Sequence, residues 1–386
     1  MKNKIILLII LILVSINITG CWDYVELNQR EVITAIGIDK GEEPGTIVVT
    51  MQSIIPYRIS TPLKPSTSET ATHVVSVTGK SFSDALVRYK QITSKNPYFQ
   101  QSRVFIIGEE AARDGVISFM NPILRSIEYR TRGWLLVAKG KASDILQRQV
   151  DVSKISADYI LDLMNSSNYM ATVPVETAHE FIKDVSVKTL SPVTAKIEAI
   201  KSEDNHFDIG YSGSAVFKKD KLIGWLDMHE TKGLLWITGK FKRGIMATGY
   251  TKTANGILTQ KVIKGKAKII PKITNGKIKI IIDIYEEGLI GENDSNIEMN
   301  STEAINSFEN QFEMEIKKQV EACLKRVQQE YKTDVFGFGE EIHKKLPRQW
   351  KEIKDSWEEI YPGVNIEVNA KVKLRATGKI IDPIKP

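Results

Sequence analysis

Three short segments place side chains with catalytic potential at spacings that come close to known motifs. The Gly-Lys-Ser at residues 79–81 resembles the end of a phosphate-binding loop, but Val74 stands where that loop needs its first glycine. Residues 210–214 resemble a nucleophile elbow, but Ser214 replaces its second glycine. The pair His229-Glu230 begins like the helix of a zinc protease, but Gly233 occupies the position of the second histidine. None of the three motifs is complete.

The remaining titratable residues do not supply a site in another way. The five histidines are dispersed, and none lies within five residues of another. A metal site built from such distant ligands is open in principle, but no spacing supports one. The acidic pairs Glu109-Glu110 and Glu340-Glu341 are typical of solvated helix faces. We therefore expect no catalytic residue, no cofactor and no metal, and a protein that is not an enzyme.

The residue with a definite chemistry is Cys21. Two lysines at positions 2 and 4 precede ten apolar residues at 5–14, a pattern typical of a secretory signal peptide. The segment that ends the signal resembles the bacterial lipobox, in which an aliphatic residue and two small residues precede a cysteine. Its members here are Ile18, Thr19, Gly20 and Cys21. Cysteine is required because its thiolate is the nucleophile that takes the diacylglyceryl group.

This reading predicts a lipoprotein signal peptide at residues 1–20 and lipid attachment, with acyl chains such as palmitate, at Cys21. Ten apolar residues are too few to span a hydrocarbon core ~30 Å thick. Two or three acyl chains would instead anchor the protein to the membrane on its extracytoplasmic side, since each buried CH₂ contributes ~0.8 kcal/mol. Two alternatives stay open: a buried N-terminal strand or helix, and an unmodified cysteine beside a conventional cleavage site.

The composition is that of an ordinary globular chain. Of the 386 residues, 42% are apolar and 26% are charged, which excludes a disordered chain or a disulfide-rich mini-protein. The net charge of +6 is not gathered in a block, so no nucleic-acid partner is indicated. The second cysteine, Cys323, falls on an apolar stripe of helical spacing. We expect it to be a buried small hydrophobe, with a reactive thiol as the alternative.

Hydrophobic patterns in the first half of the chain alternate between strands and helices. Strands are predicted near residues 32–38, 46–54, 73–77, 104–107 and 134–138. Helices are predicted near residues 83–93, 109–114, 122–129 and 142–148, with Pro122 in a first turn. Residues 56–72 are rich in Pro, Ser and Thr and are predicted to form an exposed loop.

The second half is predicted to contain a hairpin, a long helix and a final strand. Residues 213–217, 221–226 and 234–238 suggest strands and turns around a short helix. The Asn275-Gly276 dipeptide predicts a hairpin between the alternating segments 260–271 and 277–285. Asn300 and Glu303 fit the cap of a helix that runs to about residue 332. Shorter helices near 339–345 and 349–353 and a strand at 364–374 complete the chain.

These elements predict a mixed α/β (α+β) fold, with several mixed β-sheets packed with helices in about three domains. The polar segment at residues 201–210 marks a boundary. We expect an N-terminal α/β domain at 21–200 and a middle domain at 201–259. A C-terminal α/β domain at 260–386 would contain the long helix at about 301–332.

Several segments carry a resemblance to a known family. Cys21 is followed by Trp-Asp-Tyr-Val-Glu-Leu-Asn, then by Ala-Ile-Gly-Ile-Asp at 35–39. Residues 105–115, 125–130, 215–224 and 230–236 supply further matches, and the set ends with Asp334, Phe336-Gly337, His343, Pro347 and Trp350. In order and spacing, over essentially the whole chain, these segments resemble the Ger(x)C family of spore germination lipoproteins, the C subunits of nutrient germinant receptors.

The resemblance implies three mixed α/β domains, no catalytic residues, and assembly with a multi-spanning A subunit and a transporter-like B subunit. Such a complex would sit in the inner membrane of a spore and respond to amino acids, sugars or nucleosides. The expected function is a lipid-anchored, non-enzymatic receptor subunit in spore germination. One alternative is the solute-binding lipoprotein of a nutrient importer, although no paired similar halves are visible. An anchored cell-wall hydrolase is the other, and the incomplete motifs speak against it.

Overall fold

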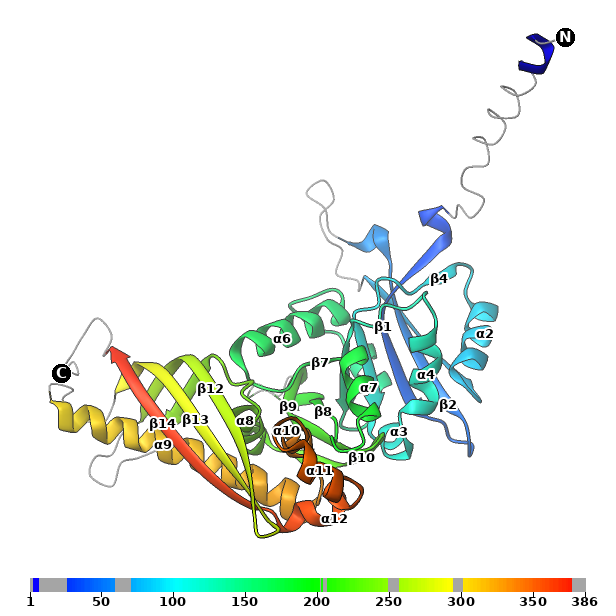
Figure 1. The fold of residues 1–386 in the computed structure, drawn as a ribbon. Helices are drawn as coiled ribbons and strands as arrows, with labels where there is room; N and C mark the ends of the chain where they lie inside the picture. Colours follow the sequence, from blue (N-terminus) through cyan, green and yellow to red (C-terminus); the bar gives the residue numbers. More distant parts are fainter. Residues whose placement is uncertain are drawn as a thin grey trace, which may run out of the picture.

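The computed structural model describes residues 3–6, 26–59, 71–201, 203, 207–248, 257–293 and 301–376. The lipobox residues Ile18, Thr19, Gly20 and Cys21, the expected cap Asn300 and most of the expected loop at 56–72 lie outside these ranges. The described chain builds a ten-stranded and a four-stranded sheet. Figure 1 shows the two sheets side by side, each with its own helices. The mixed α/β fold predicted from the sequence is therefore confirmed.

The larger sheet has the strand order β10-β9-β8-β6-β5-β1-β2-β3, with β4 paired to β1 and β7 paired to β6. Its centre is parallel, because β1, β5, β6 and β8 run in the same direction, while β2, β3, β9 and β10 complete it in antiparallel pairs. The strands are β1 (Arg30–Lys40), β2 (Ile47–Ile54), β3 (Thr72–Gly79), β4 (Asn96–Tyr98), β5 (Val104–Gly108), β6 (Trp134–Ala138), β7 (Glu176–Thr177), β8 (Val193–Lys201), β9 (Phe207–Lys218) and β10 (Lys221–Leu226).

Helices cover both faces of this sheet, which is why the whole of β5 is buried. One face packs against α2 (Phe82–Ile92), α3 (Glu109–Asp114), α4 (Ile117–Arg125) and α7 (Ala178–Ser186). The other face packs against α5 (Ala142–Gln147) and α6 (Ser156–Met170). The sheet is therefore the middle layer of three.

The smaller sheet has the order β11-β12-β13-β14. Its strands are β11 (Gly244–Thr248), β12 (Leu258–Thr274), β13 (Lys277–Asn293) and β14 (Asn365–Ala376). A separate apolar core joins it to α8 (Met228–Ile237), α9 (Thr302–Leu324), α10 (Phe338–Lys345), α11 (Pro347–Ile353) and α12 (Trp357–Ile360). The long α9 lies along this sheet in Figure 1 and continues into a π-helical segment, Lys325–Glu330. Residues of β8, β9 and β10 also belong to this core, so it connects the two sheets.

Most of the strands and helices agree with the sequence-based predictions, and the differences lie at particular residues. The hairpin through Asn275 and Gly276 is confirmed, and both residues have the positive φ of a type I′ turn. Pro122 lies inside α4 and not in its first turn. The cap of α9 is Ser301, one residue after the expected Asn300, and it accepts a hydrogen bond from the Ala304 N–H. Residues 234–237, expected among strands and turns, belong to α8. The domain boundaries at 200 and 260 stay a prediction.

Helices α8 and α9 pack closely at Gly233. A Cβ atom there would lie 2.1 Å from the Gln319 carbonyl oxygen and 2.8 Å from the Cys323 Cβ. We expect Gly233→Ala to lower the free energy of unfolding by about 1–3 kcal/mol, because the two backbones must separate. Urea unfolding measures the change. Gly363→Ala is the control, since a Cβ at that position meets no atom within 4 Å. Equal stability of the two variants would contradict the close packing.

Candidate functional site at the junction of the two sheets

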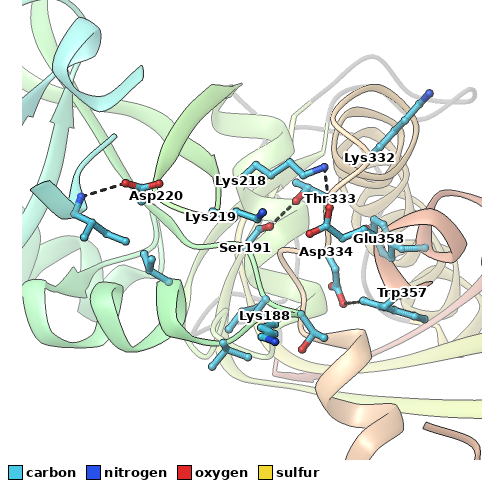
Figure 2. A pocket seen from close by; sticks show the side chains of 16 residues that line it. Lys188, Ser191, Lys218, Lys219, Asp220, Lys332, Thr333, Asp334, Trp357 and Glu358 are labelled. Atoms are coloured by element: carbon cyan, nitrogen blue, oxygen red, sulfur yellow. Dashed lines mark hydrogen bonds and ion pairs between the residues drawn. The ribbon is translucent and has the colours of Figure 1, made fainter. Parts of the chain in front are cut away.

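A cavity of about 440 Å³ lies where the two sheets meet. Figure 2 shows that its walls come from segments far apart in the sequence. The loop between α7 and β8 and the turn between β9 and β10 form one side. The residues after the π-helical segment and those of α12 form the other. The site is thus assembled only when both sheets are folded.

The centre of the junction is the buried carboxylate of Asp334, which is 5% exposed. Its two oxygens accept five hydrogen bonds of 2.9–3.2 Å. The donors are the backbone N–H groups of Phe336, Gly337, Phe338 and Gly339 and the indole Nε1–H of Trp357. Gly337 makes this turn possible, because its φ of 74° lies in the left-handed region. The carboxylate also lies at the N-terminus of α10, where the helix dipole favours a negative charge.

Burial raises the pKa of Asp334 to about 6, and the backbone hydrogen bonds act in the opposite direction. At pH 7 the side chain is therefore mainly ionised, the form that can accept all five bonds. Because both oxygens are occupied, Asp334 is not placed to exchange protons with a substrate. Its role in this geometry is to fix α10 and α12 relative to each other.

Polar contacts across the junction connect the two sheets. The Ser191 N–H donates to the Asp334 carbonyl oxygen at 2.8 Å, and the Ser191 hydroxyl hydrogen-bonds with that of Thr333. Lys218 Nζ lies 3.2 Å from Glu358 Oε2. Figure 2 shows these groups facing each other across the cavity. These contacts hold the two parts of the molecule together at the cavity.

The rim of the cavity is basic. Lys188, Lys219 and Lys332 are exposed there, and Lys219 and Lys332 both adopt left-handed φ values, of 58° and 52°. That conformation is uncommon for residues with a side chain and marks tight turns. The sequence did not single out this cluster, because Lys188, Lys219 and Lys332 lie in separate segments of the chain, and Lys332 follows Lys219 by more than a hundred residues.

The residues singled out from the sequence lie in different places. Cys21 and the rest of the lipobox are outside the described ranges. Cys323 is fully buried, as expected, and burial raises the pKa of its thiol. Asp334 and Trp350, both quoted for the family resemblance, lie in the core beside the junction. The role of Asp334 was missed. A single Asp followed by closely spaced glycines, Phe-Gly-Phe-Gly at 336–339, is the signal that could have indicated it.

No group of three or more His, Cys, Asp or Glu side chains in the described part of the chain could hold a metal ion. Within the same ranges, no helix has both the length and the apolar character needed to cross a bilayer.

Comparison with known protein families matches two adjacent models to the chain. The model of the spore germination protein N-terminal domain matches residues 23–199, and that of the spore germination B3/GerAC-like C-terminal region matches residues 212–378. The chain belongs to the GerAC family of spore germination proteins. The cavity at the junction takes residues from both segments, because the loop after α7 lies in the first match and the turn after β9 lies in the second.

Individual members of the family match at full length. Spore germination protein KC of Bacillus subtilis (strain 168) is 26% identical over 405 residues, covering 100% of this chain and 98% of its own. Spore germination proteins YndF and B3 of the same organism are 28% and 26% identical and cover 98% and 94% of this chain, and 98% and 95% of their own. The crystal structure of the GerBC protein has the same fold, with a TM-score of 0.58 at 21% identity, covering 88% of this chain and 96% of that one.

Proposed function

We propose that this protein is a lipid-anchored, non-enzymatic subunit of a spore nutrient germinant receptor. It acts in spore germination together with membrane-embedded A and B subunits, on the extracytoplasmic side of the spore inner membrane. The observation that carries the proposal is the match of both GerAC segments, in order, over residues 23–199 and 212–378. Relatives named as spore germination proteins match nearly end to end, which supports a role at the level of the whole chain.

The anchor in this proposal is Cys21, preceded by the lipobox residues Ile18, Thr19 and Gly20. Acylation of the thiol would tether the two sheets to the bilayer without a spanning helix. The alternative function, the solute-binding lipoprotein of a nutrient importer, would require two similar lobes. The two sheets differ in strand number and in order, and they share a core through β8, β9 and β10.

Substitution of the anchor tests the proposal. We expect Cys21→Ala to abolish incorporation of labelled palmitate and to release the protein from the membrane fraction of sporulating cells, because no other thiol is exposed for acylation in the described residues. Cys323→Ala is the matched control, since Cys323 is buried and should leave both readouts unchanged. Membrane retention of the Cys21→Ala protein would contradict the lipid anchor.

Deletion of the gene tests the receptor role separately. Spores should lose the response to one class of nutrient and keep their response to a non-nutrient germinant, followed by the fall in optical density. Complementation with the Cys21→Ala gene should restore the response poorly or not at all. Normal nutrient germination in a strain that lacks this gene and all its paralogues would refute the role.

A further inference from the structure

The four-stranded sheet has one covered face and one open face. Alternate residues of β13, such as Ile280, Ile282 and Ile284, are buried in the core that the sheet shares with α9. The residues between them point to the opposite side, together with their partners on β12 and β14, because paired residues of neighbouring strands share a face. We call this side the outer face. It consists of the outward residues of the segments 261–272, 279–289 and 365–375.

Lysines without an ion-pair partner concentrate on the outer face. Lys266 and Lys371 flank Tyr285 in one row across three strands, and Lys268 lies two residues further along β12. These three lysines and Lys261 are exposed, and no ion pair joins any of them to another residue in the described ranges. The sequence hides this grouping, because inward residues separate the lysines of β12 and because Lys371 belongs to a distant strand.

The carboxylates of the same face do not neutralise these lysines. All three already have partners among the other side chains of the sheet. The partners are Lys264 and Arg375 for Glu287, Lys279 for Glu367, and Asn369 for Asp283. The four lysines therefore give the outer face an uncompensated positive charge. At the ionic strength of a cell this charge acts over about 8 Å, which is far enough to attract an anionic surface.

Exposed aliphatic side chains border the lysines. Ile245 of β11 pairs with Lys261 and is 59% exposed. Ile263 occupies the β-bulge between Val262 and Lys264 and is 37% exposed. Basic side chains beside exposed aliphatic ones are typical of surfaces that lie on anionic bilayers, where the cations meet lipid phosphates and the apolar groups enter the headgroup boundary. A purely acidic polypeptide would leave the isoleucines in water, so the pattern favours a lipid surface.

We propose that the outer face of the four-stranded sheet docks on the anionic surface of a phospholipid bilayer. The four unpaired lysines would lie at the level of the lipid phosphates and Ile245 in the headgroup region. The long lysine stems let the ammonium groups reach the phosphates while the strands stay outside the hydrocarbon. Each lysine close to such a surface strengthens binding by about fivefold. The contact goes beyond the receptor role and does not require the acyl anchor, since it depends on the side chains of the sheet.

A dye on the outer face tests this contact in the full chain reconstituted into vesicles. An environment-sensitive NBD group is attached to Ile245→Cys. Met314→Cys is the matched control, because Met314 is 55% exposed on α9, the helix that covers the other face. Cys323 is buried, and any label on an unacylated Cys21 is common to both proteins.

The vesicles contain either phosphatidylcholine alone or equal parts of phosphatidylcholine and phosphatidylglycerol. We expect the emission of the dye at residue 245, and not at residue 314, to shift to shorter wavelength when phosphatidylglycerol is present. The shift should disappear at about 1 M salt, where the Debye length falls to about 3 Å. Flotation with vesicles of phosphatidylcholine alone reports on the acyl anchor, so a failure of the anchor is seen separately from a failure of the docking.

Removal of two charges connects the shift to the lysines. In the labelled Ile245→Cys protein, Lys266→Gln combined with Lys371→Gln should lower the equilibrium constant between the docked and undocked sheet at least about tenfold. This constant is read from the amplitude of the shift. Lys318→Gln combined with Lys325→Gln is the control, since it makes the same change of net charge at exposed lysines on and directly after α9. All four lysines are exposed, so neither pair of substitutions should unfold the protein.

The proposal is overturned if phosphatidylglycerol causes no shift at residue 245, or if the shifts at residues 245 and 314 are equal. It is also overturned if the two double variants dock equally well. A shift that soluble polyglutamate produces and that the anionic vesicles do not would assign the outer face to an acidic protein segment instead of a bilayer.

Discussion

Asp334→Asn is expected to lower the free energy of unfolding by about 2–5 kcal/mol, because the buried N–H groups that donate to one carboxylate oxygen would lose their acceptor, at about 1–3 kcal/mol for each group. The carboxylate accepts five hydrogen bonds, two of them on Oδ2, from the Gly339 N–H and the Trp357 Nε1–H. In asparagine an NH₂ group replaces one of the two carboxylate oxygens. The N–H groups that donate to that oxygen in the wild type would then face a donor and lose their hydrogen bonds. The lost hydrogen bonds are those that hold α10 and α12 to the residues after the π-helical segment.

The measurement is urea unfolding at pH 7, followed by far-UV circular dichroism and by tryptophan emission, to which Trp357 contributes as one of the six tryptophans of the chain. Asp355→Asn is the matched control, because Asp355 is exposed on the same stretch of chain and should change stability by no more than about 0.5 kcal/mol. If both variants unfold at the same urea concentration, Asp334 does not hold the junction together. A second expectation is that the germination response of Asp334→Asn spores weakens, since less of the protein would be folded at the junction.

The second large effect on the free energy of unfolding is expected at Glu286, and it depends on pH. It lies on β13, is fully buried, and faces the Gln260 side chain of β12 and Glu309 of α9. Burial raises the pKa of Glu286 from 4.5 to about 8, and the negative charges of Glu287 and Glu309 act in the same direction. At neutral pH the side chain is therefore mainly protonated.

The geometry agrees with a protonated carboxyl. Glu286 Oε1 and Gln260 Oε1 are both buried and have no hydrogen-bond partner within the described residues. Both lie beside Gly288, since a Cβ there would be 2.7 Å and 2.4 Å from them. A proton on Glu286 would let its hydroxyl donate to the Gln260 oxygen, which satisfies two buried acceptors together.

The sign of the pH dependence follows from the raised pKa. Between about pH 4.5 and pH 8 the folded protein holds a proton that the unfolded chain has released, so the contribution of Glu286 to stability is lost as the pH rises. The loss is about 1.4 kcal/mol per pH unit and at most about 5 kcal/mol over this window. Glu286→Gln keeps a donor at this position and cannot ionise. We therefore expect it to unfold at a higher temperature than wild type at pH 8.5 and at a similar temperature at pH 5.

Calorimetric melting at several pH values between 5 and 8.5 measures the difference between the two proteins. Glu287→Gln is the control. Lys264 and Arg375 pair with Glu287, and these contacts lower its pKa to about 2, so its substitution should shift stability by the same amount across the window. If the melting temperatures of wild type and Glu286→Gln differ by the same amount at every pH in this range, Glu286 is not protonated in the folded state.

Local sequence patterns were sufficient where neighbours in the chain determine the structure. Asn275-Gly276 predicted the hairpin because both residues tolerate positive φ. Helix α7 was missed although Thr177 and Glu180 form a capping box, a signal that was present in the sequence. The apolar stripe around Cys323 predicted its burial, because the period of α9 is visible over many residues.

Sites formed by distant residues could not be predicted in this way. The lysines of the outer face belong to β12 and β14, and alternation alone does not show which face of a strand is exposed. They come together only because both strands pair with β13. Asp334 depends similarly on Trp357, twenty-three residues later. Such sites are determined by the topology, which a single sequence does not specify.

The pairing of β9 with β8, which belongs to the N-terminal family segment although β9 begins only after that segment ends, has a practical consequence for producing parts of the protein. A fragment that ends at residue 199 would leave β8 without β9, as an unpaired edge strand in a sheet that is otherwise covered on both faces. Unpaired edges bind strands of other molecules and cause aggregation. A fragment that ends after Leu226 would keep β9 and β10 in the sheet. The fragment boundary suited to binding experiments with partner subunits therefore follows the hydrogen bonds of the sheet and not the limits of sequence similarity.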